Sequence, residues 1–215
     1  MTYLDDALRQ LRKYKELGDR ALAQIPEEGL FKRLDPESNS IALIIKHVSG
    51  NMRSRWTDFL ATDGEKPDRN RDSEFEEEAG DTPGSIRERW EGGWRLTLEA
   101  IGALAPEDLE KNVSIRGEPH TVLEAINRQL THYAYHVGQI VFLARHFAGP
   151  AWQSLSIPRG KSREFDVSKE GARYAADRRE QEPKDGGRTR SRGPGAATRT
   201  AWCPRLDTRW RGSSG

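Results

Sequence analysis

The 215-residue sequence contains a single cysteine, Cys203, near its C-terminal end. A framework of disulfides is therefore excluded, and we expect the protein to function in the reducing cytoplasm. The sequence also lacks an apolar run long enough to cross a bilayer, and its first residues lack the features of a signal peptide. We therefore expect no membrane partner.

Hydrophobic residues are scarce as well, at 34% of the chain with a mean hydropathy of -0.86. Charge is divided unevenly along the sequence. Of the 35 Lys and Arg and the 34 Asp and Glu, 12 and 6 respectively lie from Val167 onward, which leaves 23 basic and 28 acidic residues before it. We expect one domain over residues 1–166 and a basic, low-complexity, disordered tail over residues 167–215. The acidic domain carries no nucleic-acid footprint, so we expect no nucleic-acid partner.

Four segments repeat apolar residues at steps of three and four, the pattern typical of amphipathic helices. The apolar stripes run over residues 4–25, 41–59, 86–104 and 122–144. The segments have similar lengths, and no convincing sheet accompanies them. We therefore predict an all-α fold, a four-helix bundle.

Capping signals precede three of these helices. Residues 38–40 offer serine and asparagine caps to the second helix, and residues 81–83 announce the third. Residues 85–88 read as a capping box for the third helix, and Thr121 with Glu124 as one for the fourth.

Four features interrupt the helical pattern. Residues 62–80 predict a polar loop, and residues 113–117 alternate briefly, as in a short strand or an extended link. The pair Gly92-Gly93 lies within the third helix, where close approach of another helix explains it better than room for a ligand. Residues 152–160 are apolar enough to wrap against the bundle.

Histidine is the most informative residue type, and the chain has only five. His132 and His136 lie four residues apart in the fourth predicted helix, which places both imidazoles on one stripe, roughly 40° apart around the axis. His47 occupies a corresponding flank of the second predicted helix. A bundle forms a cleft where such flanks meet, so the three imidazoles can converge there and hold one divalent ion.

Spacing alone leaves another interpretation open, because a buried histidine often serves only to satisfy a hydrogen bond. The zinc-protease signature is excluded, since Tyr133 rather than a glutamate follows His132. His146 points away from the pair and lies in the last helical turn, where a cation interacts favourably with the helix dipole. His120 precedes the helix. We expect neither His146 nor His120 to be a ligand.

Residues 44–52 and 132–140 resemble the DinB/YfiT-like superfamily of proposed metalloenzymes. Its DUF1572 branch is more similar, because it also has runs like residues 56–60 and 156–160. The resemblance covers residues 2–165. It implies a four-helix bundle with one metal ion bound by three histidines, which are carried over here as His47, His132 and His136.

The resemblance implies no single reaction, and our leading hypothesis is a metal-dependent enzyme of transferase or hydrolase type. A divalent ion, zinc or nickel, would activate a water or a low-molecular-weight thiol, with a small molecule as substrate. The alternative is a non-catalytic stress-related or interaction protein whose metal site is structural or vestigial. Three imidazoles leave coordination positions open, which favours catalysis. The oligomeric state stays open, with a homodimer among the alternatives.

No catalytic residue is named by the sequence. The polar residues nearest the three histidines along their helices are candidates to hold the ligands in place. They are Asn51, Tyr133, Tyr135 and Gln139.

Overall fold

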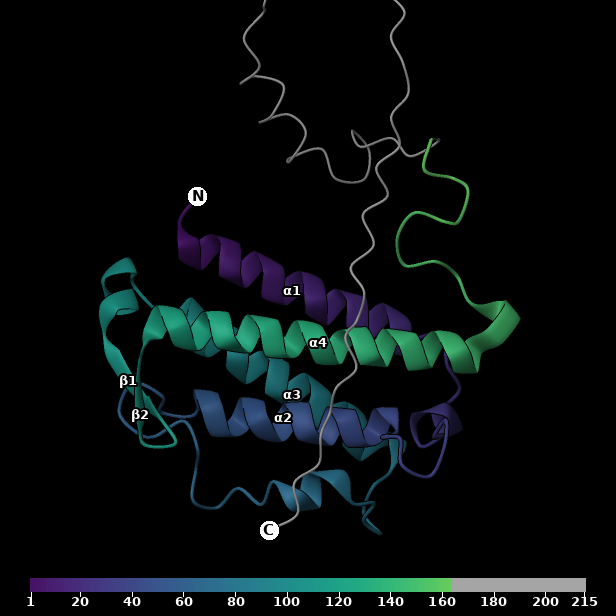
Figure 1. Cartoon of the computed structure of the whole chain (residues 1–215), viewed down its shortest axis with the longest axis horizontal. Coiled ribbons are helices and arrows are strands. Elements are labelled where there is room, and N and C mark those ends of the chain that lie inside the picture. Colours follow the sequence, from purple (N-terminus) through teal and green to yellow (C-terminus); the bar gives the residue numbers. More distant parts are fainter. Residues whose placement is uncertain (164–215) are drawn as a thin grey trace, which may run out of the picture. The chain divides into compact units, whose positions relative to one another are not determined.

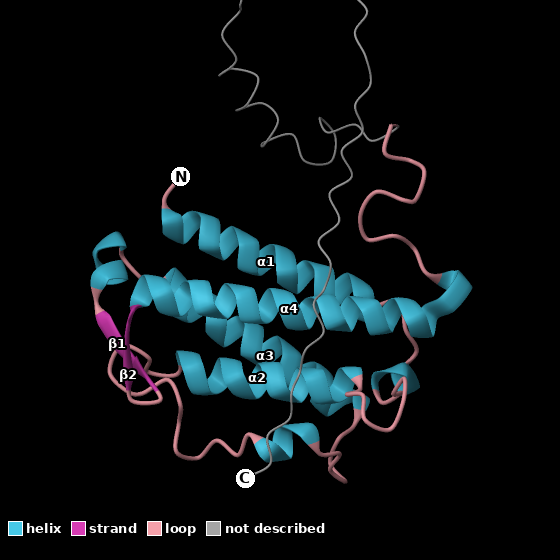
Figure 2. Ribbon diagram, in the orientation of Figure 1, coloured by secondary structure: helices cyan, strands magenta, loops and turns pink. Residues whose placement is uncertain are grey.

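The computed structural model describes residues 1–163, so the predicted tail over residues 167–215 lies outside the described part. Figures 1 and 2 show that helices dominate this part, and the prediction of an all-α fold is confirmed at that level. The long helices are α1 (Tyr3–Leu22), α2 (Ile41–Trp56), α3 (Pro83–Gly102) and α4 (Val122–Ala148). Short 3₁₀ helices are η1 (Glu27–Leu30), η2 (Asp72–Phe75), η3 (Pro106–Glu110) and η4 (Gly149–Ala151).

Each long helix packs against two others. Helix α1 contacts α3 and α4, and α2 contacts the same two helices from the other side (Figure 1). The apolar stripes of all four meet in one core, where burying each large side chain contributes about 1.5–3 kcal/mol. Fully buried side chains from the four helices include Leu11, Ile45, Trp56, Trp94, Ile126 and Tyr133.

The helix starts follow the capping residues. Ser40 caps α2 by accepting a hydrogen bond from the backbone N–H of Leu43, and Thr121 forms the predicted capping box with Glu124. The capping box predicted for α3 at residues 85–88 was wrong by three residues. The observed box joins Thr82 to Ser85, because Pro83 already occupies the first helical position.

The glycine pair of α3 has one tightly packed member. A Cβ atom on Gly93 would lie 2.9 Å from Sδ of Met52 and 3.2 Å from the backbone of Ser49, both on α2. At Gly92 nothing lies within 4 Å. Close approach of a neighbouring helix therefore accounts for Gly93, as predicted.

A hairpin of two strands, β1 (Asn112–Ile115) and β2 (Glu118–Thr121), precedes α4. The first strand was expected as one of two alternatives, whereas the second was not. The turn places Arg116 at φ 59° and Gly117 at φ 77°, both in the left-handed region. The carboxylate of Asp63 accepts hydrogen bonds from both of their backbone N–H groups, at 2.9 and 2.8 Å, and also from the hydroxyl of Ser114. These bonds fix the turn against the chain that follows α2.

The long connection between α2 and α3 is ordered around its charged side chains. Lys46 of α2 is buried, and its Nζ donates to the carbonyl of Glu76 at 2.6 Å and to Asp81 at 2.7 Å. The η2 turn packs against α2 and buries Glu74 there. The predicted polar loop therefore covers α2 with ion pairs, a role that its composition alone did not reveal.

The segment after α4 lies partly on the helices, as predicted. Trp152 and Leu155 are partly buried against the core, whereas residues 156–160 are exposed. The backbone of Gln153 and the side chain of Gln24 exchange two hydrogen bonds, of 2.7 and 3.1 Å, which tie the segment to the end of α1. None of the described helices has both the length and the apolar character that a membrane crossing requires.

Candidate metal centre

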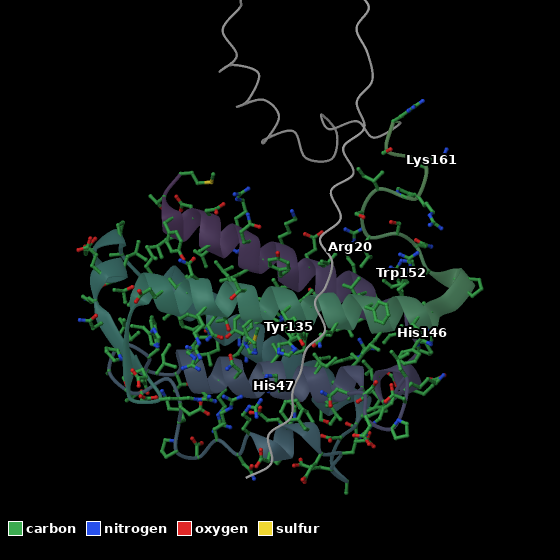
Figure 3. All side chains as sticks on the ribbon, viewed as in Figure 1. Arg20, His47, Tyr135, His146, Trp152 and Lys161 are labelled. Carbon is green, nitrogen blue, oxygen red and sulfur yellow. The ribbon has the colours of Figure 1, made fainter. Side chains whose placement is uncertain are left out.

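The three predicted histidines come together between two helices. His47 lies on α2, between α2 and α4 (Figure 3). His132 and His136 both lie on α4. The two Nε2 atoms of His132 and His136 are 3.0 Å apart, and the nearest ligand atoms of all three rings lie within 4.8 Å of one another. The predicted convergence is therefore confirmed, while metal binding by these residues stays a prediction.

Burial keeps the two α4 imidazoles neutral. It lowers the pKa of His132 to about 3, with further lowering from the neighbouring rings of His136 and His47 and from Arg69. Burial also lowers the pKa of His136 to about 4, although a hydrogen bond with Gln139 opposes the shift. Because only a neutral imidazole has a lone pair for a metal ion, both rings are in the binding form at neutral pH.

Glu74 orients His47. Its carboxylate lies 2.9 Å from Nδ1 of His47, and the adjacent Phe75 stacks on the same ring with centroids 4.8 Å apart. Burial would raise the pKa of Glu74, but hydrogen bonds from His47 and Arg69 lower it below the ordinary value. The ionised carboxylate therefore accepts a hydrogen bond from Nδ1–H of His47, which leaves Nε2 of His47 as the free ligand atom.

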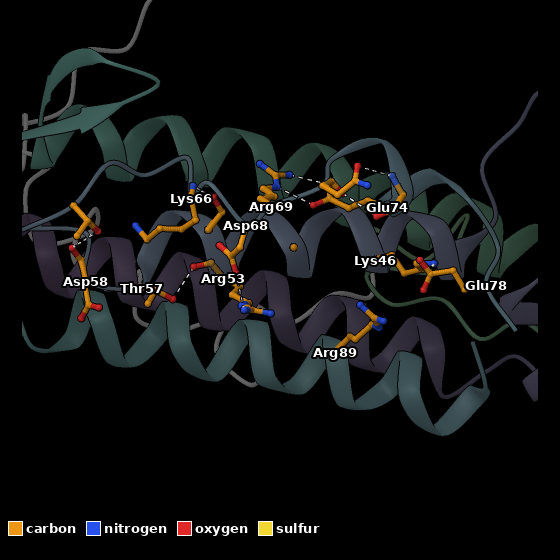
Figure 4. A pocket seen from close by; sticks show the side chains of 15 residues that line it. Lys46, Arg53, Thr57, Asp58, Lys66, Asp68, Arg69, Glu74, Glu78 and Arg89 are labelled. Carbon is orange, nitrogen blue, oxygen red and sulfur yellow. Dashed lines mark hydrogen bonds and ion pairs between the residues drawn. The ribbon is translucent and has the colours of Figure 1, made fainter. Parts of the chain in front are cut away.

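Arg69 fixes Glu74 in turn. Its Nε and Nη2 donate to the two oxygens of Glu74 at 2.8 and 2.9 Å, a bidentate pair that Figure 4 shows. Gly50 provides the space for this carboxylate, because a Cβ atom at that position would lie 2.2 Å from Oε1 of Glu74. Glu74 was not among the residues predicted from the sequence, where its one signal is an acidic residue followed by an aromatic in an otherwise polar loop.

Gln139 performs for His136 the role expected of it. Its Oε1 lies 2.8 Å from Nδ1 of His136, and its Nε2 donates to the hydroxyl of Tyr135 at 3.1 Å. Nδ1 of His136 therefore donates to the amide oxygen, and Nε2 again faces the other rings. Tyr135 also contacts His136 directly, because the two rings meet edge to face with centroids 4.8 Å apart.

The other two candidates contact each other instead of a histidine nitrogen. The hydroxyl of Tyr133 accepts a hydrogen bond from Nε1 of Trp56 at 2.9 Å and donates to Oδ1 of Asn51 at 3.3 Å. Burial raises the pKa of Tyr133, so that the hydroxyl stays protonated. Neither Tyr133 nor Asn51 therefore holds a ligand through a hydrogen bond.

The remaining two histidines lie apart from the cluster, as predicted. His120 is on β2, opposite Val113, and His146 is exposed at the end of α4 beside Phe147. Neither belongs to a group of potential metal ligands among residues 1–163.

The donor set fits a metal ion with open coordination positions. An ion with tetrahedral bonds of about 2.0–2.1 Å holds its nitrogen ligands about 3.4 Å apart. The separations in the cluster, 3.0 Å for one pair and at most 4.8 Å overall, bracket that value. Three imidazoles alone leave room for a further ligand, in contrast to the four protein ligands of a structural zinc site.

A comparison with curated proteins finds no match to this sequence. A family model described as "Protein of unknown function (DUF1572)" matches residues 1–161, which include all three histidines and Glu74. The chain therefore belongs to the DUF1572 family.

Proposed function

We propose that this protein is a metal-dependent enzyme with a DinB/YfiT-like four-helix bundle, in which His47, His132 and His136 hold one divalent ion. The observation that carries the proposal is the convergence of three imidazoles, two of them with a second nitrogen already engaged by Glu74 or Gln139. Such partners orient ligating histidines in known metal sites.

Zinc and nickel are the ions we propose, since neutral imidazole suits both and no thiolate is present in the cluster. When bound, a divalent ion supplies Lewis-acid chemistry that lowers the pKa of a water or a thiol. The single cysteine of the chain agrees with a cytoplasmic enzyme that uses a small thiol or water as nucleophile.

The chain's own residues would contribute orientation and access. Glu74 and Gln139 hold the rings of His47 and His136, and Arg69 keeps Glu74 ionised. His47 and His132 also line a cleft of about 270 Å³, so the cluster is reachable from solvent. The molecule that enters this cleft would decide the reaction type, which is either group transfer involving a thiol or hydrolysis.

The metal content of protein purified without an affinity tag tests the proposal. We expect about one divalent ion per chain, and removal of most of it by each single change His47→Ala, His132→Ala or His136→Ala, because two imidazoles hold an ion far more weakly than three. His146→Ala is the matched control on α4 and should keep full occupancy. Full occupancy in the His132→Ala protein would rule out the three-histidine site and the enzyme built on it.

A further inference from the structure

The cleft beside the histidine cluster is lined by positive charge. Arginines reach it from α2, from the connection after α2, from the β1–β2 turn and from α4, while His47, His132, Asn51 and Gln129 form the rest of its wall. None of these lining residues, all of them in the described part of the chain, is acidic. The five arginines are Arg55, Arg69, Arg71, Arg116 and Arg128.

Only part of this charge is compensated. Arg69 binds Glu74 and Glu65, and Nε of Arg116 lies 3.1 Å from the same Glu65. Arg71 lies over the ring of Phe75, 5.3 Å from its centroid. Arg128 of α4 makes no ion pair with any residue in the described part of the chain. The five guanidinium groups of the cleft are therefore paired with only two carboxylates, those of Glu65 and Glu74.

Arg55 is the clearest sign of a missing partner. Its residue surface is only 4% exposed, yet its Nε and Nη1 have no hydrogen-bond partner in the described chain. The nearest carboxylate, that of Glu65, is 4.0 Å from its Nη2. Burial lowers the pKa of Arg55, and the positive charges of Arg128 and Arg69 add to this effect while Tyr133 and Glu65 oppose it. A buried cation without a close counter-ion is costly, so Arg55 adds an uncompensated positive charge to the wall of the cleft.

One further feature suits a ligand in this place. Arg116 takes a left-handed conformation, rare for a residue other than glycine, and Asp63 holds it there through the backbone. The turn thereby presents its guanidinium group at the edge of the cleft.

We infer that this cleft binds the anionic group of a small substrate, a carboxylate or a phosphate, next to the histidine cluster. Guanidinium groups match the paired oxygens of both anions. The inference rests on the proposed function for its catalytic meaning, because the anion would place the rest of the ligand beside His47 and His132. The cleft has a volume of about 270 Å³, so the ligand must be a small, compact molecule.

A second cavity, of about 550 Å³, shares Arg69 with the smaller cleft but differs from it in charge (Figure 4). Four acidic side chains accompany the basic ones in its wall, which are Lys46, Arg53, Lys66, Arg69 and Arg89. The charges of this cavity nearly compensate one another, whereas the smaller cleft has no acidic lining residue.

Titration of the full chain with inorganic phosphate and with succinate, at constant ionic strength, tests the inference by calorimetry. We expect at least one of them to bind, and Arg128→Ala to weaken binding about tenfold, the effect of losing one charge-assisted hydrogen bond. Arg145→Ala, an equal change of charge at an exposed position of the same helix outside the cleft, should leave the affinity unchanged. Arg55→Lys, which keeps the buried charge but loses the planar fork, should also weaken binding.

The same titrations on the His136→Ala protein separate this inference from the proposed function. His136 is in the histidine cluster but does not line the cleft, so the variant should lose metal and keep the anion site. Binding of succinate alone would identify a carboxylate ligand, and binding of phosphate alone a phosphate ligand; both support the inference. Equal affinity in wild type and Arg128→Ala, or binding of a single-stranded oligonucleotide when neither small anion binds, would overturn it.

Discussion

At the scale of single residues, the three histidines depend on a carboxylate from another part of the chain, because Glu74 orients His47. His132 and His136 could be found because an interval of four residues has a fixed meaning on a helix. Glu74 is 27 residues from His47, in a loop with no period, so no local rule connects the two side chains. Only the packing of η2 on α2 brings them together.

Glu74→Gln tests this oriented pair. The substitution keeps the size of the side chain but removes the ionised acceptor for Nδ1 of His47, and we expect metal affinity to fall about 10- to 100-fold. Competition with a chromophoric chelator measures the affinity. Glu76→Gln, at an exposed position two residues away, should have no effect. Equal affinities in the two variants would show that the Glu74 contact is not part of the metal site.

The stability of the metal-free protein should depend on pH through the same cluster. The pKa values of His132 and His136 in the folded chain, about 3 and about 4, lie below the ordinary 6.5. Between roughly pH 4 and 6.5 the unfolded chain therefore takes up protons that the folded chain does not, so the free energy of unfolding falls as pH falls. The contribution is complete only above about pH 6.5.

Thermal unfolding in the presence of a chelator, from pH 7 to pH 4, measures this effect. We expect the melting temperature to decrease on acidification, and the decrease to be smaller in the His132→Gln protein, which lacks one of the two groups. Parallel curves for the two proteins would mean that His132 titrates normally in the folded chain.

At the scale of elements, apolar periodicity predicted all four helices, and capping residues predicted the starts of α2 and α4, since both signals are local. The partners of each helix could not be read in the same way. Gly92 and Gly93 illustrate the limit: the sequence shows two glycines in one helix, but only the packing of α3 on α2 tells which of them is required. Only the first strand of the hairpin was predicted, for a similar reason. The turn between the strands depends on Asp63, about 50 residues earlier in the chain.

Alanine substitution at each glycine gives a matched pair at this scale. Gly92→Ala should raise the free energy of unfolding by about 0.5–1 kcal/mol, because nothing lies near the new methyl group and alanine favours helix. Gly93→Ala should lower it by about 1–3 kcal/mol, because its Cβ would overlap Met52 and crowd the backbone of Ser49. Urea unfolding measures both. A stabilised Gly93→Ala protein would disprove the close contact between α2 and α3.

At the scale of the whole molecule, the described residues form their own core. Buried apolar side chains come from α1, α2, α3, α4 and the hairpin, and Trp152 and Leu155 cover one end of it. The remaining residues of the sequence, from Val167 to Gly215, show no apolar period and an excess of basic residues. From that composition we predict that the segment buries too little apolar surface to offset the entropy of ordering its chain.

Truncation after Asp166 should therefore leave folding intact. We expect the melting temperature of residues 1–166 to match that of the full chain and the metal content per chain to be equal, because every residue of the histidine cluster and of the arginine-lined cleft is retained. Calorimetry and elemental analysis of the two proteins make the comparison. A truncated protein that melts many degrees lower would show that the basic segment packs on the helices, and that the domain extends beyond the boundary drawn from composition.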